Sequence, residues 1–158
     1  MRAVVLAGGK GTRLRPYTAL LPKPLMPVGD VSILEIVIRQ LAAAGITRIT
    51  IAVNHMASMI MAFLGDGEQF GVPIDYSLEQ EPLGTAGTLA LVGGIEDDFL
   101  VMNGDILTDL DFRDLVQLHR NERPEVTIAT FAKSVKLEFG VLAVDEDQSV
   151  VAYDEKPE

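Results

Sequence analysis

Short apolar, β-branched segments alternate with segments of helical periodicity through most of the chain, and this alternation restricts the fold more than any other feature. Strands are expected at 2–7, 48–53, 73–78 and 99–102, and helices at 32–45, 55–64, 84–92 and 112–120. Strands that alternate with helices of this length form βαβ units with parallel strands. The sequence therefore predicts an open, mostly parallel α/β sheet flanked by helices.

The pattern changes after the fourth helix. Three further strands are expected at 126–131, 140–144 and 150–153, with no helix between them. A turn at 145–148 joins the last two strands into a hairpin. We expect an antiparallel addition near the C-terminus. A chain of 158 residues has the size of one domain, so 1–158 is predicted to be one domain without a separate second domain.

Charge and composition exclude several classes of function. The net charge of −10 argues against nucleic acid or an anionic membrane as a partner. The absence of cysteine excludes thiolate metal sites and thiol nucleophiles. No apolar run approaches the roughly 18 residues that span a bilayer, and the first apolar segment is too short for a signal peptide. A cytoplasmic location is expected.

The first predicted strand leads into a glycine-rich, basic loop, GGKGTRL at 8–14. Five basic residues precede the first acidic residue, Asp30: Arg2, Lys10, Arg13, Arg15 and Lys23. Glycines let backbone N–H groups approach an anion, and arginine supplies a forked donor. The loop matches neither the dinucleotide fingerprint, because of Leu14, nor a Walker A loop, because of Val4. It predicts a phosphate site; the alternative is a solvated basic loop.

Several side chains suited to phosphate or metal chemistry are expected at one edge of the sheet. In open α/β sheets, ligands bind beyond the carboxyl ends of the strands, and Gly8, Glu79 and Asp105 each follow a predicted strand. Lys23 lies between two prolines, which stiffen its backbone and suit a charge aimed at one phosphate. Taken alone, Lys23 also fits a solvated loop lysine, and Asp105 a helix cap or turn residue.

The runs GGKGTRLRPYT at 8–18 and PKPL at 22–25 resemble the sugar-1-phosphate nucleotidyltransferases. The resemblance recurs in the family's order at 81–87, 103–105 and 155–157 and covers essentially the whole chain. It implies a Rossmann-like fold of the nucleotide-diphospho-sugar transferase type and a requirement for Mg²⁺. It also implies a reaction that joins a nucleoside triphosphate to a sugar 1-phosphate and releases pyrophosphate.

The same resemblance assigns roles to individual residues. Arg13 would bind the departing pyrophosphate, Lys23 would reach the α-phosphate, and Asp105 would bind Mg²⁺. The residues that match nucleotide contacts are Leu6, Gly8, Gly9, Gly11, Thr12, Glu79 and Gly84. Those that match sugar-phosphate contacts are Gly140, Glu155 and Lys156. Transfer of this kind depends on positioning and on cations that meet developing charge, so no protein nucleophile is required.

The identity of the base is predicted from Glu79. Pyrimidine-using relatives commonly carry glutamine five residues before the glycine that matches Gly84. A carboxylate only accepts hydrogen bonds, and guanine offers two adjacent donors, N1–H and N2–H₂. We therefore expect GTP and a hexose 1-phosphate of the mannose type, since this run also resembles that of mannose-1-phosphate guanylyltransferases.

Two alternatives remain open. If Gln80 faces the base, the donor would be UTP or dTTP, with a glucose-1-phosphate-type acceptor. The chain could also be a non-catalytic regulatory subunit that binds nucleotide sugars.

Family members continue beyond the region matched by 155–157 with further sheet, helix and a second acidic metal ligand. The resemblance therefore implies that these residues form an N-terminal, nucleotide-binding portion, which is either truncated at the C-terminal side or completed by another chain. A sheet that ends here would leave an open edge, which favours association with another copy of the chain.

Overall fold

The computed structural model describes most of the chain, in the ranges 1–79, 83–95, 97–134, 136 and 138–156. Its internal contacts divide the chain into two compact units, Met1–Arg123 and Pro124–Glu158. Each unit has its own sheet, and each is described separately below. Among the described residues, no helix has the length and apolar character needed to cross a bilayer.

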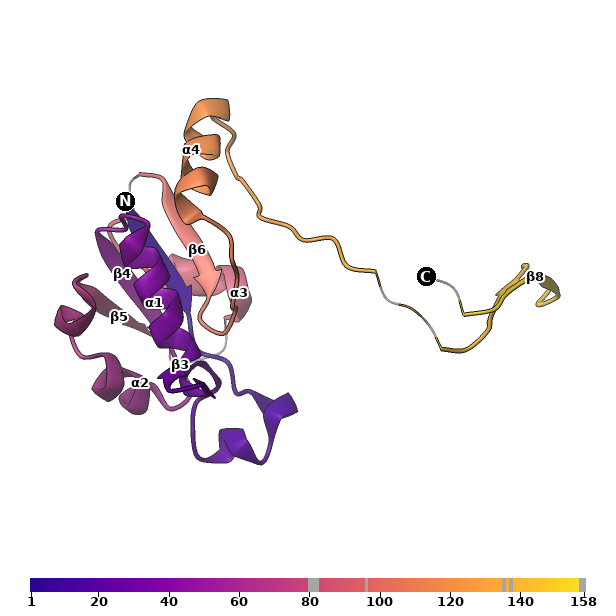
Figure 1. The fold of residues 1–158 in the computed structure, drawn as a ribbon, viewed down its shortest axis with the longest axis horizontal. Coiled ribbons are helices and arrows are strands. Elements are labelled where there is room, and N and C mark those ends of the chain that lie inside the picture. Colours follow the sequence, from indigo (N-terminus) through magenta and orange to yellow (C-terminus); the bar gives the residue numbers. More distant parts are fainter. Residues whose placement is uncertain (80–82, 96, 135, 137, 157–158) are drawn as a thin grey trace. The chain divides into compact units, whose positions relative to one another are not determined.

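The first unit is built on a four-stranded sheet in the order β5-β4-β1-β6 (Figure 1). Its strands are β1 Arg2–Leu6, β4 Arg48–Val53, β5 Ile74–Leu78 and β6 Phe99–Asn103. All neighbouring pairs are parallel. The predicted α/β sheet is thus confirmed. Because β1 lies between β4 and β6, the loop that follows β1 begins beside the loops that follow both neighbours.

One face of this sheet carries the main core. Helix α1, Ile33–Ala43, packs its apolar side on β1 and β4, while α2, Ala57–Leu64, and α4, Phe112–Glu122, add side chains to the same cluster. Leu34, Ile38 and Leu41 of α1 are completely buried. The predicted helix start is confirmed, since the Glu35 N–H donates to Ser32 Oγ at 3.1 Å. Helix α4 begins in the same way, because Asp111 Oδ1 accepts from the Arg113 N–H at 2.8 Å.

The opposite face is covered by a shorter segment. Here α3, Gly84–Gly87, continues as a 3-10 turn, η5 Thr88–Leu91. In Figure 1, α1 lies in front of the strands and α3 behind them. The sequence predicts a single helix over 84–92, but the α-helical part ends at Gly87. Glycine disfavours the α-helix by about 1 kcal/mol relative to alanine, and this segment both begins and ends with one.

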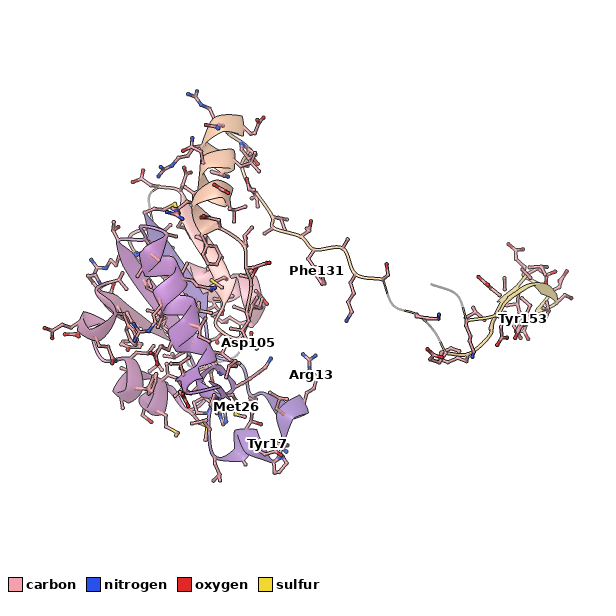
Figure 2. The ribbon with its side chains drawn as sticks, viewed as in Figure 1. Arg13, Tyr17, Met26, Asp105, Phe131 and Tyr153 are labelled. Atoms are coloured by element: carbon pink, nitrogen blue, oxygen red, sulfur yellow. The ribbon has the colours of Figure 1, made fainter. Side chains whose placement is uncertain are left out.

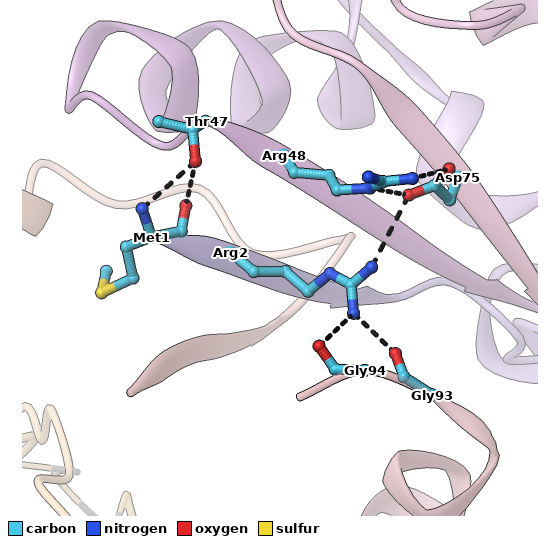
Figure 3. A network of polar contacts seen from close by, with 7 residues as sticks. All are labelled: Met1, Arg2, Thr47, Arg48, Asp75, Gly93 and Gly94. Atoms are coloured by element: carbon cyan, nitrogen blue, oxygen red, sulfur yellow. Dashed lines mark hydrogen bonds and ion pairs between the residues drawn. The ribbon is translucent and has the colours of Figure 1, made fainter. Parts of the chain in front are cut away.

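A polar network ties the strands together near their amino ends (Figure 3). Arg48 Nη2 donates to Asp75 Oδ1 at 2.9 Å, and its Nε donates to Oδ2. Arg2 Nη1 donates to the carbonyls of Gly93 and Gly94 at 2.7 and 3.2 Å, and its Nη2 lies 3.8 Å from Asp75 Oδ2. The hydrogen bonds from Arg48 lower the pKa of the Asp75 carboxyl below its ordinary value. Both arginines are therefore engaged in joining neighbouring segments.

The second unit contains an antiparallel hairpin of β7, Val141–Val144, and β8, Val150–Asp154, which confirms the predicted hairpin. The strand expected at 126–131 does not form. Alternating apolar residues favour an extended chain, but a strand also requires a partner for its backbone N–H and C=O groups. Within the described residues, this segment joins no β-ladder.

Candidate nucleotide-binding site

The loop after β1 folds back on itself through three 3-10 turns: η1 Thr12–Leu14, η2 Tyr17–Ala19 and η3 Lys23–Leu25. Gly11 adopts a left-handed conformation with φ of 60°, and its carbonyl accepts a hydrogen bond from Thr18 Oγ1 at 2.9 Å. A Cβ at Gly11 would lie 2.9 Å from Thr18 Cγ2 and 3.1 Å from Lys23 Cβ. The glycine is therefore needed for both conformation and space, and it brings the glycine-rich run beside Lys23.

Lys23 and Asp105 meet across the carboxyl edge of the sheet. Lys23 Nζ forms an ion pair with Asp105 Oδ2, and the two side chains retain 34% and 25% of their exposure. Asp105 is placed by Gly104, whose N–H donates to the Leu6 carbonyl at 2.8 Å, in continuation of the β1–β6 pairing. A Cβ on Gly104 would approach side-chain atoms of the core within 3.1 Å. The structure thus joins a loop cation and a carboxylate that are far apart in the sequence.

Arg13 lies apart from this pair. It is exposed on η1, and Figure 2 shows its side chain extending from the loop. Across the described ranges it forms no ion pair with a carboxylate. Lys23 and Asp105 are therefore brought into contact, while Arg13 is exposed on the same loop and pairs with no carboxylate of the described residues. The roles assigned to all three remain predictions.

Glu79 stands beside the start of the glycine loop. A Cβ at Gly8 would lie 3.2 Å from Glu79 Oε2 and 3.2 Å from Asn54 Cβ. Oε1 of Glu79 accepts hydrogen bonds from the Leu83 N–H at 2.6 Å and from Thr88 Oγ1 at 3.0 Å. The residues that follow β1, β4 and β5 therefore meet at one place, as the strand-end rule predicts.

Two members of this group, Asn54 and Thr88, are absent from the sequence predictions. The same rule that selected Gly8 points to Asn54, which directly follows β4. The predicted base contact Gly84 begins α3 with φ of 73°. Gln80, and the motif residues 81–82 beside it, lie outside the described residues.

The remaining predicted nucleotide contacts follow one another along the chain. Leu6 ends β1, a Cβ at Gly9 would meet nothing within 4 Å, and Thr12 begins η1. All three lie on the segment that leads to Lys23. Their contact with a nucleotide remains a prediction.

The residues predicted for the sugar phosphate gather within the second unit. The pairing of Val141 with Asp154 places Gly140 next to Glu155 across the hairpin. A Cβ at Gly140 would overlap the ring of Tyr153, so the two residues lie against each other within this unit. Lys156 follows with φ of 52°. Pro157, the last residue of the predicted motif, lies outside the described residues.

The donor set at the sheet edge fits a hard divalent cation bound together with its substrate. Among the described residues, no group of three or more His, Cys, Asp or Glu side chains could hold a metal. Mg²⁺, however, usually takes one or two carboxylates plus substrate phosphates. Asp105 supplies one carboxylate, and it already faces a cation, Lys23.

Comparison with known proteins agrees with this geometry. The nucleotidyl transferase family matches residues 2–158. A mannose-1-phosphate guanylyltransferase of Mycobacterium tuberculosis is 40% identical over 99% of this chain and 44% of its own length. A UTP–glucose-1-phosphate uridylyltransferase of Synechocystis is 36% identical, again over 99% of this chain and 44% of its own length. The chain thus spans less than half the length of these curated relatives.

Solved structures give the same result. A Bacillus anthracis protein assigned as a glucose-1-phosphate thymidylyltransferase superposes with a TM-score of 0.71 at 28% identity, over 99% of this chain and 65% of that one. HddC from Yersinia pseudotuberculosis in complex with GMP-PN superposes with a TM-score of 0.64 at 25% identity. The match covers 99% of this chain and 70% of HddC. The fold, the edge that gathers Lys23 and Asp105, and the match over residues 2–158 lead to one conclusion. The chain belongs to the nucleotidyl transferase family.

Proposed function

We infer that this chain binds a nucleoside triphosphate with Mg²⁺ at the carboxyl edge of the sheet. The protein would join the nucleotidyl group to a hexose 1-phosphate and release pyrophosphate. An oxygen of the sugar phosphate forms a bond to the α-phosphorus while the bond to the β-phosphate oxygen breaks. The ion pair of Lys23 and Asp105 beside Gly11 carries this proposal.

Each proposed site residue contributes to the reaction through its charge or through a contact with the substrate. Lys23, released from Asp105, would contact the α-phosphate, and exposed Arg13 would bind the departing pyrophosphate. Asp105 would hold Mg²⁺, which supplies positive charge against the phosphate oxygens. Fixed charges of this kind accelerate transfer because they meet charge that develops in the transition state. The sugar phosphate would be bound by Gly140, Glu155 and Lys156.

GTP is the proposed donor and mannose 1-phosphate, or a similar hexose 1-phosphate, the proposed acceptor. Relatives named mannose-1-phosphate guanylyltransferase support this choice. The uridylyltransferase relative keeps UTP or dTTP as an alternative donor. A cytoplasmic location belongs to the same proposal. Association with another copy stays a prediction from the open sheet edge.

A pyrophosphate-release assay with GTP, UTP, dTTP and ATP against a panel of hexose 1-phosphates tests the proposal. Release is expected with GTP and a mannose-type phosphate, in the presence of Mg²⁺ only, and Asp105→Ala should abolish it. Absence of both release and nucleotide binding would refute the proposal. Nucleotide binding without release for any sugar would favour the non-catalytic subunit.

A further inference from the structure

The carboxylate of Glu79 is held by its own loop. Oε1 accepts from the Leu83 N–H at 2.6 Å, a short bond of the charge-assisted type. The same oxygen lies 3.0 Å from Thr88 Oγ1, a hydroxyl in a residue that is 6% exposed. Thr88 Oγ1 is also 2.7 Å from the Gly84 carbonyl. One carboxylate oxygen therefore connects the end of β5 with both ends of the α3 segment.

The backbone fixes where this carboxylate stands. The Glu79 N–H donates to the Val53 carbonyl at 2.9 Å, which extends the β4–β5 pairing by one residue. On its other side, Oε2 faces Gly8, where the missing Cβ leaves room. Glu79 thus connects the α3 segment to the end of β5 and places its second oxygen beside Gly8.

A count of acceptors restricts what Glu79 can offer to a base. A carboxylate oxygen has two lone pairs. Oε1 accepts the Leu83 N–H, and the single hydroxyl proton of Thr88 is shared between Oε1 and the Gly84 carbonyl. Guanine pairs N1–H and N2–H₂ with a carboxylate only when both oxygens are available. Within the described residues, Oε2 accepts no hydrogen bond. One oxygen can accept one ring N–H, which guanine, uracil and thymine all possess.

We propose that Glu79 is a positioning residue, which holds the α3 segment over the glycine loop through Oε1 and offers only Oε2 to the base. The inference rests on the proposed nucleotide site and refines how that site treats its donor. Glu79 would favour bases with a ring N–H and would not distinguish GTP from UTP or dTTP. Selection among these three must then come from other groups.

The test measures binding of GTP, UTP and dTTP with Mg²⁺ to the whole chain by calorimetry. Glu79→Gln and Thr88→Val should weaken all three by a common factor of about tenfold, the loss expected for one hydrogen bond to a charged group. Thr88→Ser keeps the hydroxyl and should restore affinity. The Leu83 amide proton should resonate far downfield and exchange slowly with solvent, and Glu79→Ala should remove both properties.

Exposed Glu68 on the 3-10 turn η4, Glu68–Phe70, provides the matched control, because Glu68→Gln makes the same charge change away from the site. A loss confined to GTP in Glu79→Gln would overturn the inference and leave the proposed function intact. An unchanged Leu83 amide in Glu79→Ala would overturn it as well. If the wild type binds no nucleotide, the proposed function fails, and the Leu83 amide still decides whether Glu79 holds the loop.

Discussion

The two ends of the central sheet use the same kinds of charged residue for different purposes. Near the amino ends, Arg2 and Arg48 bind Asp75 and two loop carbonyls (Figure 3). At the carboxyl ends, Lys23 meets one carboxylate and Arg13 meets none among the described residues. An arginine whose donors are already used contributes to the fold. A cation left exposed on a glycine-rich loop is available to a ligand.

The largest effect is expected at the carboxyl edge. Lys23→Met should reduce pyrophosphate release by roughly 10²–10³, because it would remove the charge proposed to contact the α-phosphate in the transition state. If release is too slow to measure in this chain, affinity for the Mg²⁺–nucleotide is the readout. Lys23→Arg keeps the charge and should recover part of the loss. A rate unchanged by Lys23→Met would show that the cation at the carboxyl edge does not serve the reaction.

Gly11→Ala tests the backbone under that lysine. Alanine at φ of 60° costs about 1–2 kcal/mol, and its Cβ would collide with Thr18 Cγ2 at 2.9 Å. Urea unfolding should show this loss, and nucleotide affinity should fall with it. Gly9→Ala is the control for stability, since nothing lies within 4 Å of its Cβ position and its φ is not left-handed. Equal stability of the two variants would contradict the packing described here.

At the amino ends of the strands, a substitution is expected to lower stability and to leave nucleotide affinity nearly unchanged. Asp75→Asn should lower the midpoint of thermal unfolding by roughly 1–3 °C, the range expected for exposed ion pairs. Nucleotide affinity should stay within about twofold of the wild type, because every bond that is lost lies at the other end of the strands. A large loss of affinity would show that the two ends are not independent.

The smallest effect concerns pH. The pKa of Asp75 is lowered in the folded state, first by hydrogen bonds from Arg48. Its contribution to stability is therefore complete above the unfolded-state pKa of about 3.9 and is lost as the pH falls through the folded-state value. The difference in unfolding midpoint between wild type and Asp75→Asn should be present at pH 7 and shrink toward pH 3. A difference that grows on acidification would show that the sign is wrong.

The sheet was predictable because each strand is a short run rich in apolar residues, followed within two positions by glycine or a polar residue. Ser32 with Glu35 and Asp111 at the start of α4 likewise follow from local capping chemistry. The segment 126–131 has the same local character but forms no ladder in the described structure. Strand propensity is local, whereas pairing depends on what lies alongside.

The sequence predicts which residues lie at the strand ends of the candidate site. It predicts far less about the contacts that these residues make with one another. Glu79, Gly8 and Asp105 were found because parallel strands present their carboxyl ends at one edge. The bonds from Leu83 and Thr88 to Glu79 were not predictable, because they depend on the path of a loop. The ion pair of Lys23 with Asp105 depends in the same way on how the loop turns at Gly11.

The register of the central strand has a consequence for biosynthesis. β1 is bonded on one side to β4 and on the other to β6, with Leu6 opposite both Ala52 and Asn103. On the ribosome, the opening loop therefore emerges long before its carboxylate partner has been translated. Pairing between segments so distant in sequence is slow. Until the stretch up to Asp105 has left the exit tunnel, Lys23 lacks the carboxylate with which it pairs in the folded chain.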